Sequence, residues 1–540
     1  MERSPLSPAR RKPERFTSRA VSLQSALILV VFVASVLGAS GCGGSRERPR
    51  VLVIGLDGAT FAVLDPLIQE GVLPNLAALR SRGGGGVLES VLPVVSPPAW
   101  TTAFTGVNPG KHNIYDFFHA TAAGPQAILT SSLDRRADPV WEVLNENGVR
   151  TGIMNIPMTF PPEKVDGFMI SGFPFGAAQT GYTSPPELEK RVAPYPLDLF
   201  GESIQPGAEG QLLAHFRKTL DRHAAVAEAL LVEEEWDLFW VVFTGPDKVQ
   251  HFFWKFTDPE HPEYDPALAE RFGSAIRDLW IRMDSVVGEL VDLAGPETDI
   301  LVMSDHGFGP IHSELRLMSW LVQEGFVQID REHPARSSVR AVAPGPFGGL
   351  VRVNQRDRDF RGTVPPGEAS ERVLEEVREG LTALVDPTTG APFVQEIHLR
   401  DELFHGPWVG NAPDLVFLEA PRGFVGRGGL EGDAFGPPGY TFSGFHRPDG
   451  ILWGAGPHIP PNAARGHFSI VDVTPTLLWL FGVDLPADLD GTVMADLIGA
   501  DALEARPVVR GERTVVTPVA QAVETPAAER EVLESLGYVR

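Results

Sequence analysis

Short apolar runs alternate with amphipathic stretches along most of the chain. Four runs are short and strongly apolar, which is typical of buried strands. They lie at residues 51–56, 151–154, 237–243 and 299–303. Four longer stretches carry apolar residues at helical spacing, and they lie at residues 62–83, 140–148, 211–234 and 267–293. Strands that alternate with helices predict an α/β fold in which helices flank a central, mainly parallel sheet.

Proline and glycine residues mark further boundaries in the first part of the chain. Pro74 is expected to break the first helical stretch, and the glycines at 83–86 are expected to end it. A strand is predicted over residues 87–95, followed by a helix with Ser96 as its N-cap and Gly106 at its end. The Ser96 hydroxyl would then lie beside a helix N-terminus, where anions bind.

Other parts of the chain have less regular stretches. Proline, glycine and aromatic residues at 160–195 predict a long irregular excursion, and the Pro-, Gly- and Arg-rich residues 336–365 predict loop. Helical spacing returns at 369–384. Strands are predicted at 414–418 and 450–454.

Composition and charge indicate a protein with a large core and exclude some kinds of function. With 540 residues, of which 43% are hydrophobic, the chain can bury a large core. The formal net charge is −24, and no cluster of Lys and Arg of the kind that binds phosphate backbones lies beyond residue 41. No nucleic-acid binding is therefore expected. Cys42 is the single cysteine, which excludes a disulfide within the chain.

The N-terminus has the layout of a signal peptide. Arginine and lysine residues precede an apolar segment at 26–37, which is too short to span a bilayer. Ala39-Ser40-Gly41 comes directly before Cys42 and resembles a bacterial lipobox. This predicts removal of residues 1–41, acylation of Cys42 and export, with the lipid anchoring the chain on the periplasmic or cell-surface side of a bacterial membrane. The alternative is an uncleaved or ordinarily cleaved signal with an incidental thiol.

Candidate catalytic residues follow three of the predicted strands. Asp57 comes directly after the first run, at the end of the strand where open α/β sheets bind ligands. The strand at 237–243 leads into Asp247 and His251, whose spacing would place both on one face of a helix. The strand at 299–303 leads into Asp305 and His306, on a turn closed by glycine.

Carboxylates beside imidazoles suit zinc, manganese or iron better than calcium. Either pair alone is a weak signal. An Asp-x-x-x-His pair on a helix is more often part of a solvated face, and an Asp-His-Gly sequence is often only turn chemistry.

Taken together, these residues resemble the site of the alkaline phosphatase superfamily, closest to its type I phosphodiesterase and nucleotide pyrophosphatase branch. The resemblance spans residues 51–498. It is carried by Asp57, Pro74-Asn75-Leu76, Ser96, Thr105-Gly106 with Pro109 and His112, Asp247 with His251, Asp305-His306-Gly307, and Gly444-Phe445-His446. It implies an alkaline-phosphatase-like sandwich with two divalent metal ions, zinc being expected first and manganese or iron as alternatives.

The resemblance also implies a role for each site residue. One ion would be held by Asp247, His251 and His446, and the second by Asp57, Ser96, Asp305 and His306. Ser96 would be the nucleophile and would form a phosphoryl-serine intermediate. The implied function is a metal-dependent phosphodiesterase or nucleotide pyrophosphatase that acts on a small-molecule or lipid phosphoester.

Two other functions stay open on the sequence alone. A phosphomonoesterase or phosphotransferase of the same superfamily could use the same metal core. A catalytically silent surface lipoprotein could keep the fold for binding.

These expectations divide the chain into four parts. They are a signal peptide at 1–41, a linker at 42–50, a catalytic domain at 51–500 with inserted loops or a small lobe at 331–400, and a tail at 501–540.

Overall fold

The computed structural model describes residues 48–121, 124–175, 180–197, 205–330, 332–333, 337–438, 442–461 and 465–517. The predicted signal peptide, Cys42 and the last part of the predicted tail lie outside the described residues. The description below concerns the unit Pro49–Arg540. Within the described ranges, no helix has both the length and the apolar character needed to cross a membrane.

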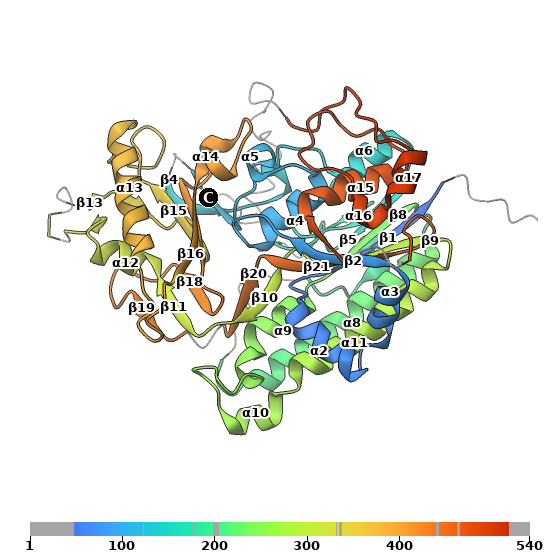
Figure 1. Ribbon diagram of the computed structural model, residues 1–540, viewed down its shortest axis with the longest axis horizontal. Coiled ribbons are helices and arrows are strands. Elements are labelled where there is room, and N and C mark those ends of the chain that lie inside the picture. Colours follow the sequence, from blue (N-terminus) through green and yellow to red (C-terminus); the bar gives the residue numbers. More distant parts are fainter. Residues whose placement is uncertain are drawn as a thin grey trace, which may run out of the picture. The chain divides into compact units, whose positions relative to one another are not determined.

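A nine-stranded sheet forms the centre of this unit (Figure 1), with its strands in the order β22-β2-β21-β9-β1-β8-β5-β6-β7. Five adjacent strands pair in parallel, namely β1 (Arg50–Leu56), β5 (Thr151–Met154), β6 (Gly167–Ile170), β8 (Leu238–Phe243) and β9 (Thr298–Met303). The other members are β2 (Gly84–Glu89), β7 (Thr183–Ser184), β21 (Asp449–Ala455) and β22 (Arg465–Ser469). The predicted α/β fold with a mainly parallel sheet is confirmed.

Helices cover both faces of this sheet (Figure 1). Leu52 and Ile54 pack against one layer, whereas Val51 and Val53 pack against the other. Successive side chains of a strand point to opposite faces, so a run without polar residues is buried on both. The first layer contains α2 (Phe61–Glu70), α3 (Pro74–Arg82), α8 (Glu209–Glu233), α9 (Gly245–Phe253) and α11 (Ala275–Ala294). The second contains α4 (Ser96–Thr105), α6 (Val140–Glu146) and α15 (Val473–Leu480).

Two predicted helices are each divided into two. The stretch 62–83 forms α2 and α3, with the break just before Pro74 as predicted. The stretch 267–293 forms α10 (Pro266–Phe272) and α11. The buried Asp284 carboxylate of α11 accepts hydrogen bonds from the backbone N–H groups of Asn75 (3.1 Å) and Leu76 (2.8 Å), which fixes the start of α3 to α11.

The prediction of a strand at 87–95 is wrong at both ends. Strand β2 begins at Gly84, inside the glycine run, and ends at Glu89. A Cβ at Gly85 or Gly86 would lie 2.0 Å or 1.9 Å from a carbonyl oxygen of the neighbouring strands, so glycine is what allows those strands to approach. Only Gly83 acts as expected, since it follows the last residue of α3.

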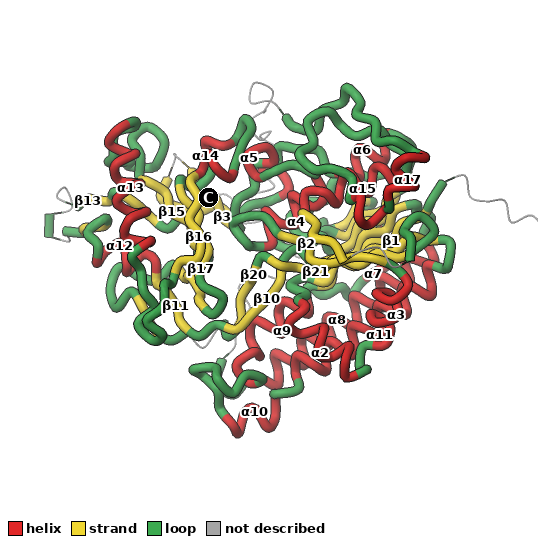
Figure 2. The backbone as a smooth tube through the Cα atoms, in the orientation of Figure 1, coloured by secondary structure: helices red, strands yellow, loops and turns green. Residues whose placement is uncertain are grey.

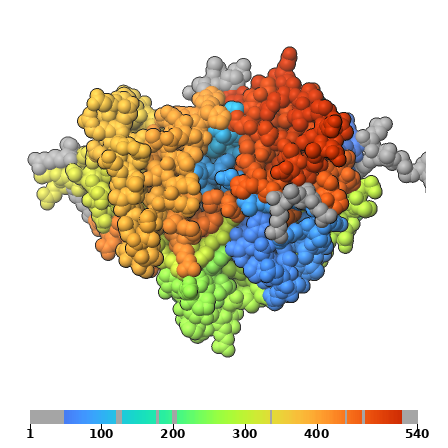
Figure 3. Space-filling view, in the orientation of Figure 1, coloured from blue at the N-terminus to red at the C-terminus, as the bar shows by residue number. Residues whose placement is uncertain are grey.

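A smaller, four-stranded sheet forms from residues 341–419, and its part of the surface lies to one side in Figure 3 (yellow to orange). Its order is β14-β15-β17-β16, and all its pairings are antiparallel. The strands are β14 (Ala341–Val342), β15 (Gly349–Val353), β16 (Val394–Leu399) and β17 (Leu415–Glu419). Helix α13 (Glu368–Thr382) packs on it through Val373, Val377 and Leu381.

This sheet corrects one prediction and confirms another. Residues 336–365 were expected to be loop, but they contain β13 (Ser338–Val339), β14 and β15. Pairing with β17, which is distant in sequence, orders this stretch rich in proline and glycine. The strand predicted at 414–418 is confirmed as β17, and the excursion at 160–195 is less irregular than expected, because it contains β6, β7 and α7 (Leu188–Val192).

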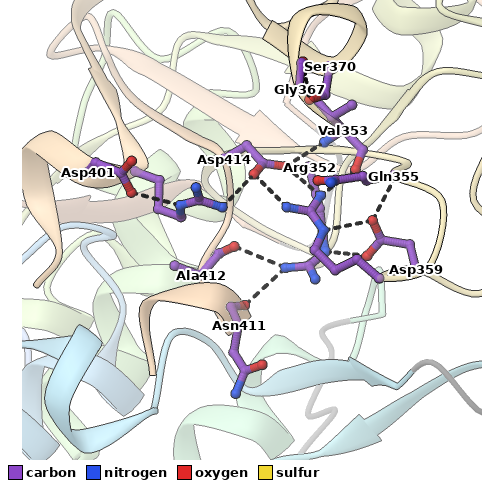
Figure 4. Close-up of polar contacts among 12 residues, drawn as sticks. Arg352, Val353, Gln355, Asp359, Gly367, Ser370, Asp401, Asn411, Ala412 and Asp414 are labelled. Atoms are coloured by element: carbon purple, nitrogen blue, oxygen red, sulfur yellow. Dashed lines mark hydrogen bonds and ion pairs between the residues drawn. The ribbon is translucent and has the colours of Figure 1, made fainter. Parts of the chain in front are cut away.

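Ion pairs fix the start of β17 (Figure 4). Asp414 accepts hydrogen bonds from Arg358 at 2.7 Å and from Arg400 at 3.1 Å. Arg352 donates to Asp359 at 2.6 Å and to the carbonyl oxygens of Asn411 (3.0 Å) and Ala412 (2.9 Å). One guanidinium thus holds two backbone carbonyls and one carboxylate.

The remaining elements connect the two sheets or cover their ends. The strands are β3 (Phe118–Thr121), β4 (Gly124–Leu129), β10 (Gly307–Pro310), β11 (Ser313–Arg316), β12 (Val327–Gln328), β18 (Gly423–Gly426), β19 (Phe435–Gly436) and β20 (Gly444–Arg447). The helices are α5 (Pro109–His112), α12 (Leu317–Gln323), α14 (Arg400–Leu403), α16 (Ala495–Ile498) and α17 (Ala500–Ala505). Figure 2 shows the antiparallel pair β10 and β20 between the two sheets.

Candidate active site

The predicted site residues meet at the carboxyl ends of three adjacent strands. β1 lies between β8 and β9 and runs parallel to both, so the segments that follow the three strands emerge side by side. Asp57 follows β1, Asp305 and His306 follow β9, and the first turn of α9 after β8 carries Asp247.

A first group consists of Asp247, His251 and His446, whose ligand-type atoms all lie within 4.8 Å of one another. His251 is one helical turn after Asp247 on α9. His446 reaches the site because β20 pairs with β10, which places His446 opposite Phe308. The Nε2 atoms of His251 and His446 each lie 3.3 Å from Asp247 Oδ1, and they are 3.1 Å from each other.

A second group consists of Asp57, Asp247 and His306. Asp247 therefore stands in both groups, whereas the sequence analysis placed Asp305 with Asp57 and His306. Asp305 is nevertheless adjacent, because its Oδ2 lies 3.2 Å from His306 Nε2. Its other oxygen accepts a hydrogen bond of 3.3 Å from the backbone N–H of Gly58.

The candidate ligands His251, His306 and His446 all turn Nε2 toward the site. His251 Nδ1 lies 2.9 Å from the carbonyl oxygen of Gly444, and the Nδ1 atoms of His306 and His446 lie 3.0 Å from the carbonyl oxygens of Gly307 and Val94. A carbonyl can only accept, so each ring carries its proton on Nδ1 and directs Nε2 at the carboxylates. Metal-ligating histidines in proteins usually have this arrangement.

The carboxylates show the same need for a partner. Asp57 Oδ1, Asp247 Oδ1 and Asp305 Oδ2 are buried, and no described group forms a hydrogen bond with any of them. Buried polar atoms are normally satisfied. Converging carboxylate oxygens and imidazole lone pairs are the donor set of zinc and related divalent ions, so the residues present fit metal binding.

The pKa values of the site residues also favour a bound cation. Burial and the neighbouring carboxylates raise the pKa of Asp57 well above its usual range and that of Asp305 to about 8. Burial raises the pKa of Asp247, but His251 and His446 outweigh it and hold that pKa well below its usual value. Burial, with His306 nearby, lowers the pKa of His446 to about 3. The site thus opposes accumulated negative charge, which a bound cation would balance.

Ser96 stands at the edge of the second group, with its Oγ 3.4 Å from His306 Nε2. The prediction that Ser96 is the N-cap of its helix is wrong by one residue, since α4 begins at Ser96 and Val95 is the N-cap. The predicted anion site at this helix start is also weak. Pro97 and Pro98 have no N–H, and Ala99 N already donates to the carbonyl oxygen of Val95 at 3.3 Å.

A comparison with protein families assigns the chain. Residues 51–449 match the model of the family described as type I phosphodiesterase / nucleotide pyrophosphatase. The chain belongs to this family. The match covers both groups of candidate metal ligands and Ser96. The type I phosphodiesterases are part of the alkaline phosphatase superfamily, so the recognition made from the sequence motifs is confirmed.

Solved structures show the same alkaline-phosphatase-like fold at low sequence identity. Murine ectonucleotide pyrophosphatase / phosphodiesterase 5 matches with a TM-score of 0.52 and 16% identity, over 83% of this chain and 100% of that one. An inactive form of the murine protein in complex with AMP matches with a TM-score of 0.50 and 15% identity, over 81% and 95%. Phosphonoacetate hydrolase from Sinorhizobium meliloti, in complex with phosphonoformate, matches with a TM-score of 0.51 and 15% identity, over 82% and 98%. No curated protein sequence matches significantly.

Trp100 is a candidate site residue that the sequence analysis missed. It lies one turn after Ser96 on α4, is fully buried, and donates its indole N–H to Asp57 Oδ2 at 3.1 Å. Helix α4 thus places both the serine hydroxyl and the group that orients Asp57. The four-residue spacing from Ser96 was the signal that could have revealed it.

Two other histidines, His112 and His312, have structural contacts. His112 is fully buried, contacts Thr102 Oγ1 through Nε2 at 3.0 Å, and accepts from the backbone N–H of Ile114 at 3.1 Å. Burial lowers the pKa of His112 to about 3, so it is neutral at neutral pH. His312 lies 3.1 Å from Asp258.

Proposed function

We propose that the chain is a metal-dependent hydrolase of phosphoric ester bonds, of the phosphodiesterase or nucleotide pyrophosphatase type. The observation that carries this proposal is the convergence of three imidazole Nε2 atoms on three carboxylate oxygens that form no hydrogen bond with the described residues. Membership of the type I phosphodiesterase family supports it.

In this proposal, Asp247, His251 and His446 hold one divalent ion, and Asp57, Asp305 and His306 hold the other together with Ser96. Asp247 could contact both, since it belongs to both groups. Zinc is the first expectation, and manganese or iron would fit the same donors. Bound ions of this kind supply Lewis acidity, which lowers the pKa of a coordinated hydroxyl and stabilises a leaving oxygen.

Ser96 would carry the covalent step. Its Oγ forms a bond to phosphorus while the bond from phosphorus to the leaving oxygen breaks, and the serine proton passes through water to that leaving oxygen. Water then attacks phosphorus in the phosphoryl-serine, releases the product and restores the hydroxyl. Trp100 keeps Asp57 oriented during both steps through its hydrogen bond to Oδ2. The buried position of Ser96, which is 7% exposed, keeps bulk water from competing before the leaving group departs.

We infer that the substrate is a small-molecule or lipid phosphodiester. The AMP complex of the murine relative and the phosphonoformate complex of the bacterial one support a small phosphorus-containing ligand. A phosphomonoester is the competing substrate class on this fold.

The test compares bis-p-nitrophenyl phosphate with p-nitrophenyl phosphate, each with added zinc or manganese. We expect a higher kcat/KM on the diester. A higher kcat/KM on the monoester would make the chain a phosphomonoesterase. No turnover of either ester by protein with bound metal, followed by a failed screen of nucleotides and glycerophosphodiesters, would favour the silent binding protein.

We also propose export and lipid anchoring through Cys42, with the domain division given by the sequence analysis. The support is the order of basic residues, apolar segment and small residues before Cys42.

A further inference from the structure

Arg447 directly follows the candidate ligand His446 on β20, and its guanidinium contacts three backbone carbonyls. Nη1 donates to the carbonyl oxygen of His446 at 2.7 Å. Nη2 donates to the carbonyl oxygens of Pro310 at 2.9 Å and Gly423 at 3.2 Å. One side chain therefore joins β20, β10 and the start of β18.

A buried carboxylate balances the positive charge of this guanidinium. Glu419, the last residue of β17, has its Oε1 3.5 Å from Arg447 Nη1, and the two side chains are 7% and 16% exposed. Charges buried to this degree are costly unless they are paired and hydrogen-bonded. The pair connects the small sheet, through β17, to the strand that carries His446.

The position of His446 depends on such support. β20 pairs with β10 in a two-stranded sheet, and an isolated two-stranded pair is marginally stable. The ring of His446 is oriented at one end by the carbonyl oxygen of Val94. Arg447 holds the backbone of the same residue from the other side. Gly309 of β10 leaves room for the guanidinium, because a Cβ there would lie 3.0 Å from Arg447 Nε.

We propose that Arg447, balanced by Glu419, is a positioning residue that holds His446 in the geometry needed for metal binding by the Asp247–His251–His446 group. The small sheet then supports the metal centre through β17 and β18. This inference rests on the proposed function, since it requires that the group binds a divalent ion.

The chain offers a matched control in Arg352. That guanidinium also donates to two backbone carbonyls and pairs with a carboxylate, Asp359, and the two side chains are 13% and 12% exposed (Figure 4). Its partners all lie in or next to the small sheet. Loss of its contacts should affect stability without moving His446.

The experiment compares the wild type with Arg447→Lys and Arg352→Lys. Metal-free protein is titrated with zinc against a competing chelator, well below the unfolding temperature, and thermal unfolding is measured without metal. Lysine keeps the positive charge but lacks the planar guanidinium group with its several N–H donors. It therefore cannot hold the three carbonyls in the same geometry. We expect zinc binding at one of two sites to weaken about 10- to 100-fold in Arg447→Lys, as is usual when support of a metal ligand is lost. Arg352→Lys should bind zinc like the wild type even though its metal-free form unfolds at a lower temperature.

Equal zinc affinity in all three proteins would overturn the inference and leave Arg447 with a purely structural role. If Arg447→Lys does not fold, Glu419→Gln takes its place, because it keeps the shape and removes only the balancing charge. It should weaken the same site by a smaller factor, and unchanged affinity would again overturn the inference. Failure of the metal-binding part of the proposed function would look different, since the wild type itself would then bind no zinc, and failure of the hydrolase activity alone would show in the ester assay and not in the zinc titration.

Discussion

His251 Nε2 and His446 Nε2 lie 3.1 Å apart. In each ring the proton is on Nδ1, which contacts a backbone carbonyl. The two nitrogens therefore face each other with lone pairs, and Asp247 Oδ1 lies 3.3 Å from both. Such a contact is repulsive unless a metal ion or a shared proton lies among the three atoms. The two histidines are 195 residues apart in the sequence, so the fold as a whole has to bring this group together.

Removal of metal should abolish turnover and lower the melting temperature together. Binding that occurs only in the folded state adds to the free energy of unfolding, and at 100 times the Kd this amounts to about 2.7 kcal/mol. Calorimetry with and without chelator, alongside an activity assay, measures both effects. His446→Ala should bind one equivalent less metal, whereas His467→Ala, at an exposed position, should bind the wild-type amount. Full activity after exhaustive chelation would refute the two-metal proposal.

Ser96→Ala should remove the covalent step and lower kcat by several orders of magnitude, as loss of one member of a catalytic unit usually does. Thr101→Val is the matched control on the same helix. The Thr101 hydroxyl is buried and has no hydrogen-bond partner within the part of the chain that the structure describes, so its removal should leave activity and stability nearly unchanged. Acid quenching of a reaction with a labelled diester, followed by peptide mapping, locates the phosphoryl group.

Absence of label from Ser96, together with wild-type turnover by Ser96→Ala, would disprove the nucleophile assignment. Direct attack by water on the diester would then be the better mechanism.

Much of the fold and site could be predicted because the relevant signals are local. Strands β1, β8 and β9 each end in an apolar run, and Asp57, Asp305 and His306 lie within three residues of the end of such a run. His446 is different, since nothing local marks it and only its pairing with Phe308 on β10 brings it to the site. His446 was predicted as a ligand from the family motif and could not be predicted from the pattern of apolar positions.

Two of the wrong predictions share a physical cause. Gly84 to Gly86 and the stretch around β15 contain residues that favour turns, and they become strands because partners distant in sequence pair with them. The role of Arg447 was equally hidden, because its three carbonyl partners lie on separate strands. Tertiary pairing of this kind leaves no local pattern.

The lipobox-like sequence predicts that Cys42 is the first residue of the mature protein and carries lipid. Cys42→Ser should move the protein from the membrane fraction to the soluble fraction, because an acyl anchor is what would hold the chain at the bilayer. Fractionation and mass spectrometry of the N-terminal peptide measure this. The Ser96→Ala variant should stay in the membrane fraction and serves as the control. An unmodified Cys42 in membrane-extracted protein would refute the prediction.

Asp116 should make the stability of the protein depend on pH. The residue is 5% exposed, its Oδ1 accepts from the backbone N–H of Phe117 at 2.7 Å, and no described group forms a hydrogen bond with its Oδ2. Gly345 packs directly on that oxygen, since a Cβ there would lie 1.8 Å from it. Burial raises the pKa of Asp116 to about 7, although the Phe117 N–H opposes this change.

The sign of the effect follows from proton binding. The unfolded chain loses this proton near pH ~3.9, whereas the folded protein keeps it to about pH 7. Between these values the folded state holds more protons, so Asp116 lowers the free energy of unfolding as the pH rises. Asp116→Asn has no proton to lose. Its free energy of unfolding should therefore rise relative to that of the wild type across this window, by about 1.4 kcal/mol for each increase of one in pH. Denaturant titrations of both metal-free proteins at several pH values test this, and a difference that stays constant from pH 4 to 8 would show that Asp116 keeps its ordinary pKa.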